Sequence, residues 1–393
     1  MSQQRPEVAD VFRTYEKEFF ARWGSVTSAH QRRAFNAIRD CRTAAMGGHV
    51  QYVEQCDQCG HQVILYNSCC NRSCPKCQGA ARAKWLAERE SEVLPVPYFH
   101  VVFTVPQKVG GLALQNAKEI YSILFRAASE TLLTITADPQ HLGAAIGFLA
   151  ILHTWGQKLQ LHPHLHCVVP GGGISSDGRR WVGCKKKSFF LSVKVLSARF
   201  RKLFITYLEE AFQAGRLKFH GEMAGLARPA AFDGLCRAAK RLKWVVFAKP
   251  PFGGAEQVLK YLARYTHRVA ISNHRLLSMS DGRVSFEYKD YAGGNQIKVM
   301  TLEATEFIRR FLLHVVPRGF VRIRQFGFLA NRARRKKLAL CRALLNANPP
   351  EKAAGTAEER PRRLCPMCQI GHMILRRTIL VGCPALITGW NSS

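Results

Sequence analysis

The chain has 393 residues, of which 47% are hydrophobic and 22% charged, a balance typical of folded globular proteins rather than disordered ones. It carries 58 Lys and Arg against 27 Asp and Glu, which gives a formal charge of +31. Because each neutralised phosphate releases counterions, this excess favours a nucleic-acid partner. An anionic membrane surface is the alternative, disfavoured because no amphipathic anchor or lipidation signal stands out.

Neither a signal peptide nor a membrane span is expected from the sequence. The residues Met1-Ser2-Gln3-Gln4-Arg5-Pro6 are polar and lack the apolar run of a signal peptide. The longest apolar stretches, 142–152 and 379–386, are too short to span a bilayer. We therefore expect a cytoplasmic protein with no membrane partner, in which the 14 cysteines favour metal binding over a disulfide framework.

Hydrophobic periodicity predicts the elements in chain order. Residues 7–45 are expected to be helical, and a Cys-rich segment, 49–78, precedes a helix at 80–93. Strands are then expected at 98–105, 148–153, 164–169, 244–248, 269–272 and 284–288, and helices at 112–137, 196–214, 255–268 and 305–314. Residues 175–178 read Ser-Ser-Asp-Gly, a hairpin turn signal. The pattern predicts an α+β fold with a largely antiparallel sheet.

Two Cys-x-x-Cys pairs, Cys56/Cys59 and Cys74/Cys77, are separated by 14 residues. Each pair places two thiolates on one side of a tight turn, and two such knuckles complete a tetrahedral sulfur site for Zn²⁺. Four protein ligands close the site, so this zinc is expected to be structural. Two further zinc sites are open alternatives, one formed among Cys41, His49, Cys69 and Cys70, the other a knuckle of Cys365, Cys368, His372 and Cys383.

A histidine cluster, His162-Pro163-His164-Leu165-His166, begins one of the expected strands. Residues two apart in a strand point to the same face, so His164 and His166 can chelate one ion while Leu165 faces the core. His153 falls roughly opposite His166 if the two strands form a hairpin, and we prefer it to His162 as the third ligand. Three ligands leave open positions for Lewis-acid catalysis on a phosphate. A surface histidine cluster without an ion is the alternative.

The segment 255–268 reads AEQVLKYLARYTHR and is expected to be helical. Tyr261, Arg264, Tyr265 and Arg268 fall at i, i+3, i+4 and i+7, so they share one face. Two tyrosines one turn apart suit attack on a phosphodiester. Arginines and a metal-polarised phosphate help a phenol, whose ordinary pKa is about 10, to become a phenolate. Stacking of Tyr on Arg at a surface helix is the alternative.

The sequence resembles the rolling-circle transposases of the insertion-sequence ninety-one family, which belong to the histidine-hydrophobic-histidine (HUH) endonucleases. The resemblance covers about residues 8–345. Its most specific segments are Cys41-Arg42-Thr43, Gly47-Gly48-His49, Cys74-Pro75-Lys76-Cys77-Gln78, 97–104, 152–157, 162–173 and 244–277. The chain departs from the family pattern at Cys70 and Ser73, where Arg and His are usual, which argues against a zinc ligand at position 73. It departs again at Gln325-Phe326, where His-Tyr is usual.

The resemblance implies an HUH-type antiparallel sheet with flanking helices and a small N-terminal zinc-stapled domain. It also implies that His164 and His166 bind Mg²⁺ or Mn²⁺, and that Tyr261 and Tyr265 form 5′-phosphotyrosine links to DNA. Imidazole ligands suit Zn²⁺ equally. The expected domains are a helical and zinc-binding one over 1–95, a catalytic one over 96–345, a linker over 346–363 and a Cys-containing tail over 364–393.

The expected function is metal-dependent nicking and rejoining of single-stranded DNA at insertion-sequence termini and in target DNA, in the nucleoid of a bacterium. Transesterification needs no ATP, in agreement with the lack of a Gly-x4-Gly-Lys-[Ser/Thr] loop. DNA contacts are expected from Arg264 and Arg268 and, in the basic run 322–337, from Arg322, Arg324, Arg334 and Arg335. The alternatives are a replication-initiator or relaxase-type nickase and a noncatalytic zinc DNA-binding protein.

Overall fold

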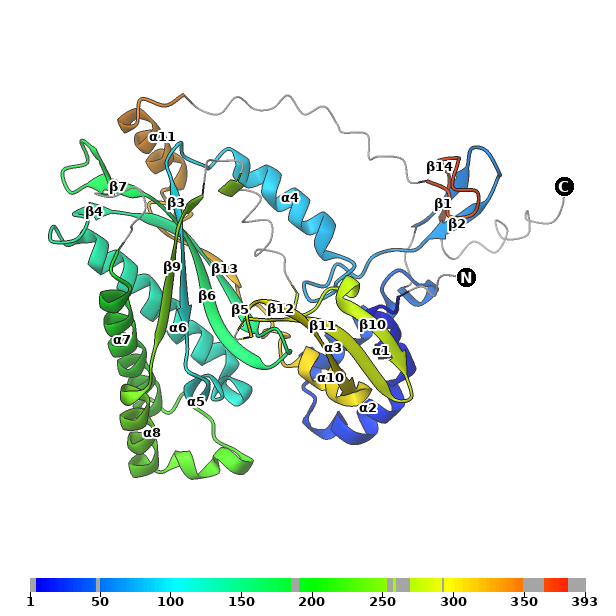
Figure 1. Ribbon diagram of the computed structural model, residues 1–393, viewed down its shortest axis with the longest axis horizontal. Helices are drawn as coiled ribbons and strands as arrows, with labels where there is room; N and C mark the ends of the chain where they lie inside the picture. Colours follow the sequence, from blue (N-terminus) through cyan, green and yellow to red (C-terminus); the bar gives the residue numbers. More distant parts are fainter. Residues whose placement is uncertain are drawn as a thin grey trace.

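The structure, a computed structural model, describes residues 5–46, 50–184, 191–252, 257–258, 269–291, 293–348 and 364–380. A five-stranded antiparallel sheet forms its centre, in the order β13-β5-β6-β3-β9 (Figure 1). Its strands are β3 (Tyr98–Thr104), β5 (Gly147–Trp155), β6 (Leu161–Pro170), β9 (Val245–Phe252) and β13 (Ile323–Gly327). β5 and β6 are consecutive and form a hairpin, so the expected α+β class with an antiparallel sheet is confirmed.

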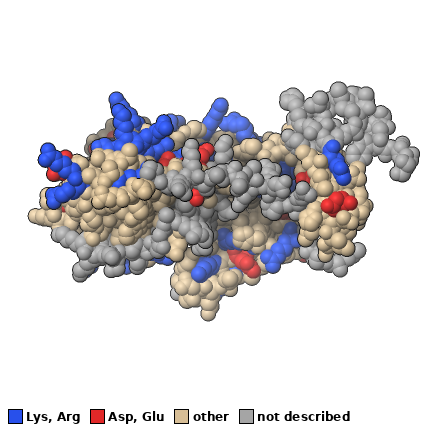
Figure 2. Space-filling view, turned by 90° about the horizontal axis from the view of Figure 1, so that it is seen from above, with Lys and Arg blue, Asp and Glu red and all other residues tan. Residues whose placement is uncertain are grey.

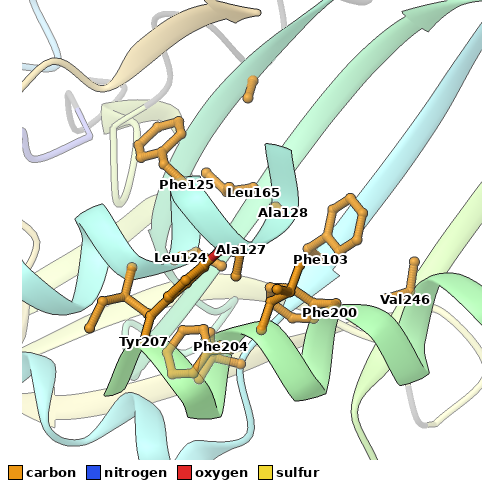
Figure 3. Close-up of a cluster of buried hydrophobic side chains, with 14 of the residues drawn as sticks. Phe103, Leu124, Phe125, Ala127, Ala128, Leu165, Phe200, Phe204, Tyr207 and Val246 are labelled. Atoms are coloured by element: carbon orange, nitrogen blue, oxygen red, sulfur yellow. The ribbon is translucent and has the colours of Figure 1, made fainter. Parts of the chain in front are cut away.

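One face of the central sheet is covered by helices and carries the main core. These helices are α5 (Gln107–Gly110), α6 (Ala113–Ala137), α7 (Val193–Gln213) and α8 (Pro229–Arg241). Phe103 and Leu165 point from the strands into this core, where they join Leu124, Phe200 and Phe204 from α6 and α7 (Figure 3). Burial of each large apolar side chain contributes about 1.5–3 kcal/mol to the free energy of folding. The apolar side chains that enter this core therefore fix the orientation of the strands that carry them.

The opposite face of the sheet is covered only in part. Tyr98, Leu149, Ile151 and Val168 form a small apolar cluster there, and the buried Val258 packs against it. Partly buried side chains from α4 (Gln78–Glu90) also join this cluster. Because side chains alternate along a strand, residues of β5 and β6 that do not enter the main core point to this face.

The N-terminal helices pack onto a second sheet. This sheet contains β10 (Leu276–Ser280), β11 (Arg283–Asp290) and β12 (Gln296–Glu303), and it is followed by α10 (Ala304–Leu312). The helices are α1 (Val8–Thr14), α2 (Glu16–Trp23) and α3 (Ala29–Asp40), the last begun by a capping box between Ser28 and Gln31. In their common core Phe12 stacks on Phe35 and meets Phe311 edge to face. The expected division at residue 95 therefore separates segments that share one core.

Two smaller sheets complete the described part of the chain. One has the order β14-β1-β2, with β1 (Val50–Cys56), β2 (Gln62–Leu65) and β14 (Met373–Leu380). The other joins β4 (Ala144–Ala145), β7 (Gly172–Ser175) and β8 (Trp181–Gly183), near α11 (Arg334–Leu344). Short 3-10 turns lie at Gly24–Val26, Ala44–Met46, Gly221–Ala227 and Asn273–Arg275.

Most of the expected elements in the described residues are present, and one expected strand needs correction. The hairpin turn is confirmed between β7 and β8, where the N–H of Gly178 donates to the carbonyl of Ser175. The strand expected at 269–272 is wrong: Val269, Ala270 and Ile271 are buried in an irregular segment, and the strand begins at Leu276. The basic run 322–337 includes β13 and the start of α11. Within the described residues, no helix is long and apolar enough to cross a membrane.

Candidate functional site

Three histidines converge on the partly open face of the central sheet. Leu165 is fully buried in the main core, so its neighbours His164 and His166 point to the other face, as the alternation in the sequence predicts. His153 joins them from β5, and one ring nitrogen of each histidine lies within 4.8 Å of the others. The register differs from the sequence-based expectation: His153 lies opposite His164, and Ile151 lies opposite His166.

Hydrogen bonds orient two of the three imidazoles. The Nδ1 of His164 lies 2.6 Å from the carbonyl oxygen of His162, to which it donates, so Nε2 is the nitrogen left for a ligand. The Nδ1 of His166 lies 2.8 Å from Nε2 of the buried His100. Such partners fix the ring tautomer in metal sites. His162, the alternative third ligand, lines the pocket but does not belong to the group of three histidines.

His100 is a site residue that the sequence analysis missed. It lies on β3, where Phe99, Val101 and Phe103 enter the main core. It therefore points to the other face of the sheet, called the histidine face here because His153, His164 and His166 lie on it. Burial lowers the pKa of His100 to about 3, with smaller contributions from the positive charges of Lys249 and His164. A polar residue at a buried position of an apolar strand was the signal available in the sequence.

The histidines form the floor of a pocket of about 710 Å³. Its walls come from β9 and from β11 and the residue after it, and they include Phe247, Lys289 and Tyr291. The side chains of Phe247 and Tyr291 are 48% and 64% exposed, unusual values for aromatic residues. The Nζ of Lys289 lies 5.5 Å from the ring centroid of Tyr291. The pocket thus combines a histidine floor with exposed aromatic rings and positive charge.

The tyrosine pair lies outside the described residues. Tyr261, Arg264, Tyr265 and Arg268 all belong to the segment 259–268, which the structure does not describe. The described residue nearest to them on the N-terminal side is Val258, which is 1% exposed and packs on the histidine face against Ile151 and Val168.

The cysteines form two clusters of four, and neither is the set expected from the sequence. Cys74 and Cys77 lie with Cys41 and Cys69, whereas Cys56 and Cys59 lie with Cys365 and Cys368. The prediction that Cys56, Cys59, Cys74 and Cys77 bind one zinc ion is therefore wrong. The Cys-x-x-Cys spacing indicates that a pair of cysteines forms a metal-binding knuckle. It does not indicate which second pair completes the four-ligand site. Cys70 and His372 belong to neither cluster, and His49 and Cys383 lie outside the described residues.

The arginines expected to contact DNA have different surroundings. Burial, together with nearby Arg72, lowers the pKa of Arg322 to about 10. The guanidinium carbon of Arg324 lies 4.2 Å and 4.9 Å from the ring centroids of Phe125 and Phe320. Both side chains thus have partners within the protein, and their contact with DNA stays a prediction.

The C-terminal part of the basic run is more exposed. Arg334 forms an ion pair with Glu92, with 3.1 Å between Nε and Oε1. Arg335, Lys336 and Lys337 follow it on α11 and are exposed. In the view of Figure 2, Lys and Arg side chains are prominent along the upper edge of the molecule, with few Asp and Glu among them.

Comparisons with known proteins agree with this arrangement. Residues 147–337 match the family described as "Putative transposase", and residues 11–105 match "Transposase zinc-binding domain". The chain is 54% identical over 385 residues to "Putative transposase y4qJ" of Sinorhizobium fredii, a match that covers 95% of this chain and 96% of that relative. The chain belongs to the IS91 family of transposases.

A second relative of the transposase is named for an insertion sequence. The chain is 28% identical over 275 residues to the transposase for insertion sequence element IS801 of Pseudomonas savastanoi pv. phaseolicola, with coverage of 70% of this chain and 64% of the relative. Among solved structures, the conjugative relaxase TrwC in complex with oriT DNA is 18% identical, with 42% of this chain and 70% of the relaxase covered. Its TM-score of 0.24 is too low to support an argument.

Family membership decides between the functions expected from the sequence. The protein is a DNA-acting transposase with a zinc-binding domain, and this identification stands over the replication-initiator and the noncatalytic alternatives. The zinc-binding match begins in α1 and ends just after β3, so it includes the first central strand as well as the cysteines up to Cys77.

Proposed function

We propose that this transposase nicks and rejoins single-stranded DNA at insertion-sequence termini and in target DNA, through a divalent ion held by His153, His164 and His166. The convergence of these three imidazoles on the floor of a pocket carries the proposal. Three protein ligands leave positions for a phosphate oxygen, which a fourth side chain would block. The reaction belongs in the nucleoid of a bacterial cytoplasm, where the DNA substrates lie.

The donor set fits a divalent transition ion. All three donors are neutral imidazoles, which suit Mn²⁺ or Zn²⁺ better than Mg²⁺, an ion that prefers carboxylate and water oxygens. We therefore favour Mn²⁺ over Mg²⁺ at this site. When bound, the ion would polarise the scissile phosphate and stabilise the charge that develops on it. The chain's own contribution is a fixed orientation of the imidazoles, set by His162 and His100.

Tyr261 and Tyr265 are the proposed nucleophiles. Support comes from their spacing and from the position of Val258, which is buried on the same sheet face as the histidines. Val258 precedes Tyr261 by only three residues in the sequence. A phenolate that attacks the phosphorus forms a phosphotyrosine ester and releases a 3′-hydroxyl, which later attacks the ester and restores the phosphodiester.

The pocket walls support a single-stranded substrate. Exposed aromatic rings bind unpaired bases by stacking, and nearby cations hold the backbone. Phe247 and Tyr291 offer such rings, and Lys249 lies with its Nζ 5.9 Å from the Phe247 centroid. In a duplex the bases are already stacked on each other, so these rings would have no free face to bind.

One zinc ion is assigned to Cys41, Cys69, Cys74 and Cys77 in this proposal. The Sγ atoms of Cys41 and Cys69 each lie 3.6 Å from that of Cys77. A tetrahedral site with Zn–S bonds of about 2.3 Å requires sulfur atoms about 3.8 Å apart. Three of these cysteines are buried in the core beside the N-terminal helices, which supports a structural role for the ion.

The test is a search for the covalent intermediate. The full-length protein is incubated with labelled single-stranded oligonucleotides that cover both element ends, with Mn²⁺, and a denaturing gel is used to detect a protein–DNA adduct. We expect an adduct from the wild type and none from the double variant Tyr261→Phe/Tyr265→Phe. His164→Ala should form no adduct at low Mn²⁺ concentration.

The matched control is Tyr15→Phe, which removes a phenolic hydroxyl from the start of α2 and leaves the pocket unchanged. It should form the adduct at the wild-type level. Equal adduct from the wild type and from the double tyrosine variant would overturn the catalytic proposal. The same oligonucleotides annealed to their complements test the strand requirement, because a duplex should give little adduct.

A further inference from the structure

The second cysteine cluster joins the two ends of the described chain. Cys56 is the last residue of β1 and Cys59 lies in the turn after it, whereas Cys365 and Cys368 precede β14. The Sγ atoms of Cys56 and Cys368 are 3.7 Å apart, and those of Cys59 and Cys365 are 3.6 Å apart. A disulfide requires about 2.05 Å, whereas the edge of a ZnS₄ tetrahedron is about 3.8 Å. The spacing therefore fits a shared metal ion and not two disulfides.

The two cysteine pairs have the same local geometry. The N–H of Gln58 donates to Sγ of Cys56 at 3.4 Å, and the N–H of Met367 donates to Sγ of Cys365 at 3.4 Å. The residue after each second cysteine is left-handed, with φ of 72° at Gly60 and 56° at Gln369. Backbone N–H groups directed at sulfur stabilise thiolates, the form that binds metal. Each pair is thus folded as a knuckle, and each knuckle supplies only two ligands.

Backbone contacts hold the two knuckles against each other. The N–H of Asp57 donates to the carbonyl of His372 at 3.1 Å, and the N–H of His372 donates to Oδ1 of Asp57 at 2.7 Å. A Cβ added to Gly371 would lie 2.5 Å from Sγ of Cys56, so only glycine fits there. β14 then continues as the antiparallel partner of β1, with Met373 opposite Cys56.

We infer that Cys56, Cys59, Cys365 and Cys368 bind one structural zinc ion, and that this ion fastens the C-terminal tail to the N-terminal zinc-binding domain. The site is separate from the cluster of Cys41, Cys69, Cys74 and Cys77. Each cluster has four sulfur ligands and is closed, so the transposase carries two cysteine-bound zinc ions. This inference does not rest on the proposed nicking chemistry.

The site makes the tail a structural part of the zinc-binding domain. β1 has β2 on one side and β14 on the other, so the tail supplies one edge of this three-stranded sheet. A small domain with little apolar core depends on such a metal ion for its fold. In the described residues of this sheet, the buried apolar cluster holds only Cys56, Cys365 and Met373, with Val63 and Cys368 against it.

The experiment counts zinc in the full-length protein. A mercurial thiol reagent releases cysteine-bound zinc, which a chromophoric chelator then measures. We expect two zinc ions per chain from the wild type and one from Cys365→Ser/Cys368→Ser. Cys56→Ser/Cys59→Ser and the variant with all four substitutions should also release one, because both pairs serve the same ion. The matched control is Cys70→Ser, an exposed cysteine outside both clusters, which should release two.

Two results would overturn the inference. One is wild-type zinc content in Cys365→Ser/Cys368→Ser together with a loss in Cys56→Ser/Cys59→Ser, which means that other residues complete the first pair. The other is the loss of one ion in each double variant and of both ions in the variant with all four substitutions. That result would mean that the two pairs bind different ions. If a serine variant does not fold, the number of ions is measured by cobalt substitution of the wild type. Sulfur-to-cobalt charge-transfer absorption should rise until two Co²⁺ are bound, and saturation at one would contradict the assignment.

Discussion

The Nε2 atom of His100 lies 2.8 Å from the Nδ1 atom of His166, inside the central sheet of the transposase. His166 binds a metal through Nε2 only if its Nδ1 carries the proton, and that proton needs an acceptor. Burial lowers the pKa of His100 to about 3, so its imidazole is neutral near pH 7 and Nε2 can accept. We therefore expect His100 to be a positioning residue for His166, one of the three proposed ligands.

Replacement of His100 should weaken metal binding without removing a ligand. We expect His100→Phe to lower the affinity for Mn²⁺ about 10- to 100-fold, the usual effect of losing an outer-shell partner. Isothermal titration calorimetry with Mn²⁺ measures the affinity, and adduct formation should recover at saturating Mn²⁺. His100→Gln offers an acceptor oxygen and should restore part of the loss. An unchanged Mn²⁺ affinity in His100→Phe would contradict this role.

Phe247 should bind an unpaired base by stacking. Its ring is 48% exposed at the edge of the pocket, so packing in the core does not explain an aromatic side chain at this position. Loss of one base stack costs about 1–3 kcal/mol, so Phe247→Ala should weaken single-stranded DNA binding roughly 5- to 100-fold. Fluorescence anisotropy with a labelled oligonucleotide measures this.

Two further variants test that explanation for Phe247. Phe247→Tyr retains the ring and should bind as the wild type does. Val299→Ala removes another exposed apolar side chain, 57% exposed on β12 and outside the pocket, and should have no effect. Equal losses in Phe247→Ala and Val299→Ala would show that the effect is not stacking.

Local patterns predicted the histidine face well. Alternation along β6 is enforced by burial of Leu165, so the orientation of His164 and His166 followed from the sequence alone. His153 was within reach because a short loop joins its strand to β6. The predicted register was wrong by two residues of β6, since His153 lies opposite His164 and not opposite His166. The pairing also shifts between His153 and Trp155, an irregularity that spacing in the sequence does not reveal.

Contacts between distant segments were not predictable in the same way. The tail strand β14 pairs with β1 across about 300 residues of sequence, and no local spacing indicates which cysteine pair will meet Cys56 and Cys59. Arg324 shows the same difficulty, because its charge suggested DNA whereas its position over two aromatic rings depends on the fold. Spacing identifies the chemistry of such residues, and tertiary packing selects their partners.

Neighbouring basic residues on α11 should have different roles. Arg335, Lys336 and Lys337 are exposed, so their combined replacement by Ala should weaken DNA binding and reduce its salt dependence. Each lost phosphate contact lowers the slope of log K against log salt by about 0.7 for a single strand. Arg334 is paired with Glu92, so Arg334→Ala should instead lower the free energy of unfolding by about 1–3 kcal/mol.

The salt titration separates these roles. Affinities for one oligonucleotide are measured at several salt concentrations for the wild type, the triple variant and Arg334→Ala, and urea unfolding is followed for each. The assignment fails if Arg334→Ala reduces the salt slope as much as the triple variant does. It fails equally if the triple variant loses stability but no affinity.

His314 should make the stability of the transposase sensitive to acid. Its Nε2 donates to the carbonyl of Leu159 at 3.1 Å, and its Nδ1 accepts from the hydroxyl of Thr154 at 3.2 Å, so the buried ring is neutral. Burial lowers its pKa to about 4, although the hydrogen bond to Leu159 acts in the opposite direction. In the unfolded chain the pKa of a histidine is about 6.5.

The sign of the pH effect follows from these two pKa values. Above pH 6.5 neither state binds the proton, and the stability from neutral His314 is fully present. Between about pH 6.5 and 4 the unfolded chain binds a proton that the native state does not, so the free energy of unfolding falls as pH falls. The total loss is roughly 3 kcal/mol, from the difference between the two pKa values.

Urea unfolding between pH 7 and 4.5 tests the role of His314. His314→Gln keeps hydrogen-bonding capacity but cannot titrate, so its stability should fall less over this range than that of the wild type. Other groups titrate in both proteins, and the difference between the two curves isolates His314. Parallel curves would contradict the assignment. Leu159 lies in the turn between β5 and β6, and Thr154 lies near the end of β5, beside His153. The wild type should therefore also lose Mn²⁺ affinity in acid more steeply than His314→Gln.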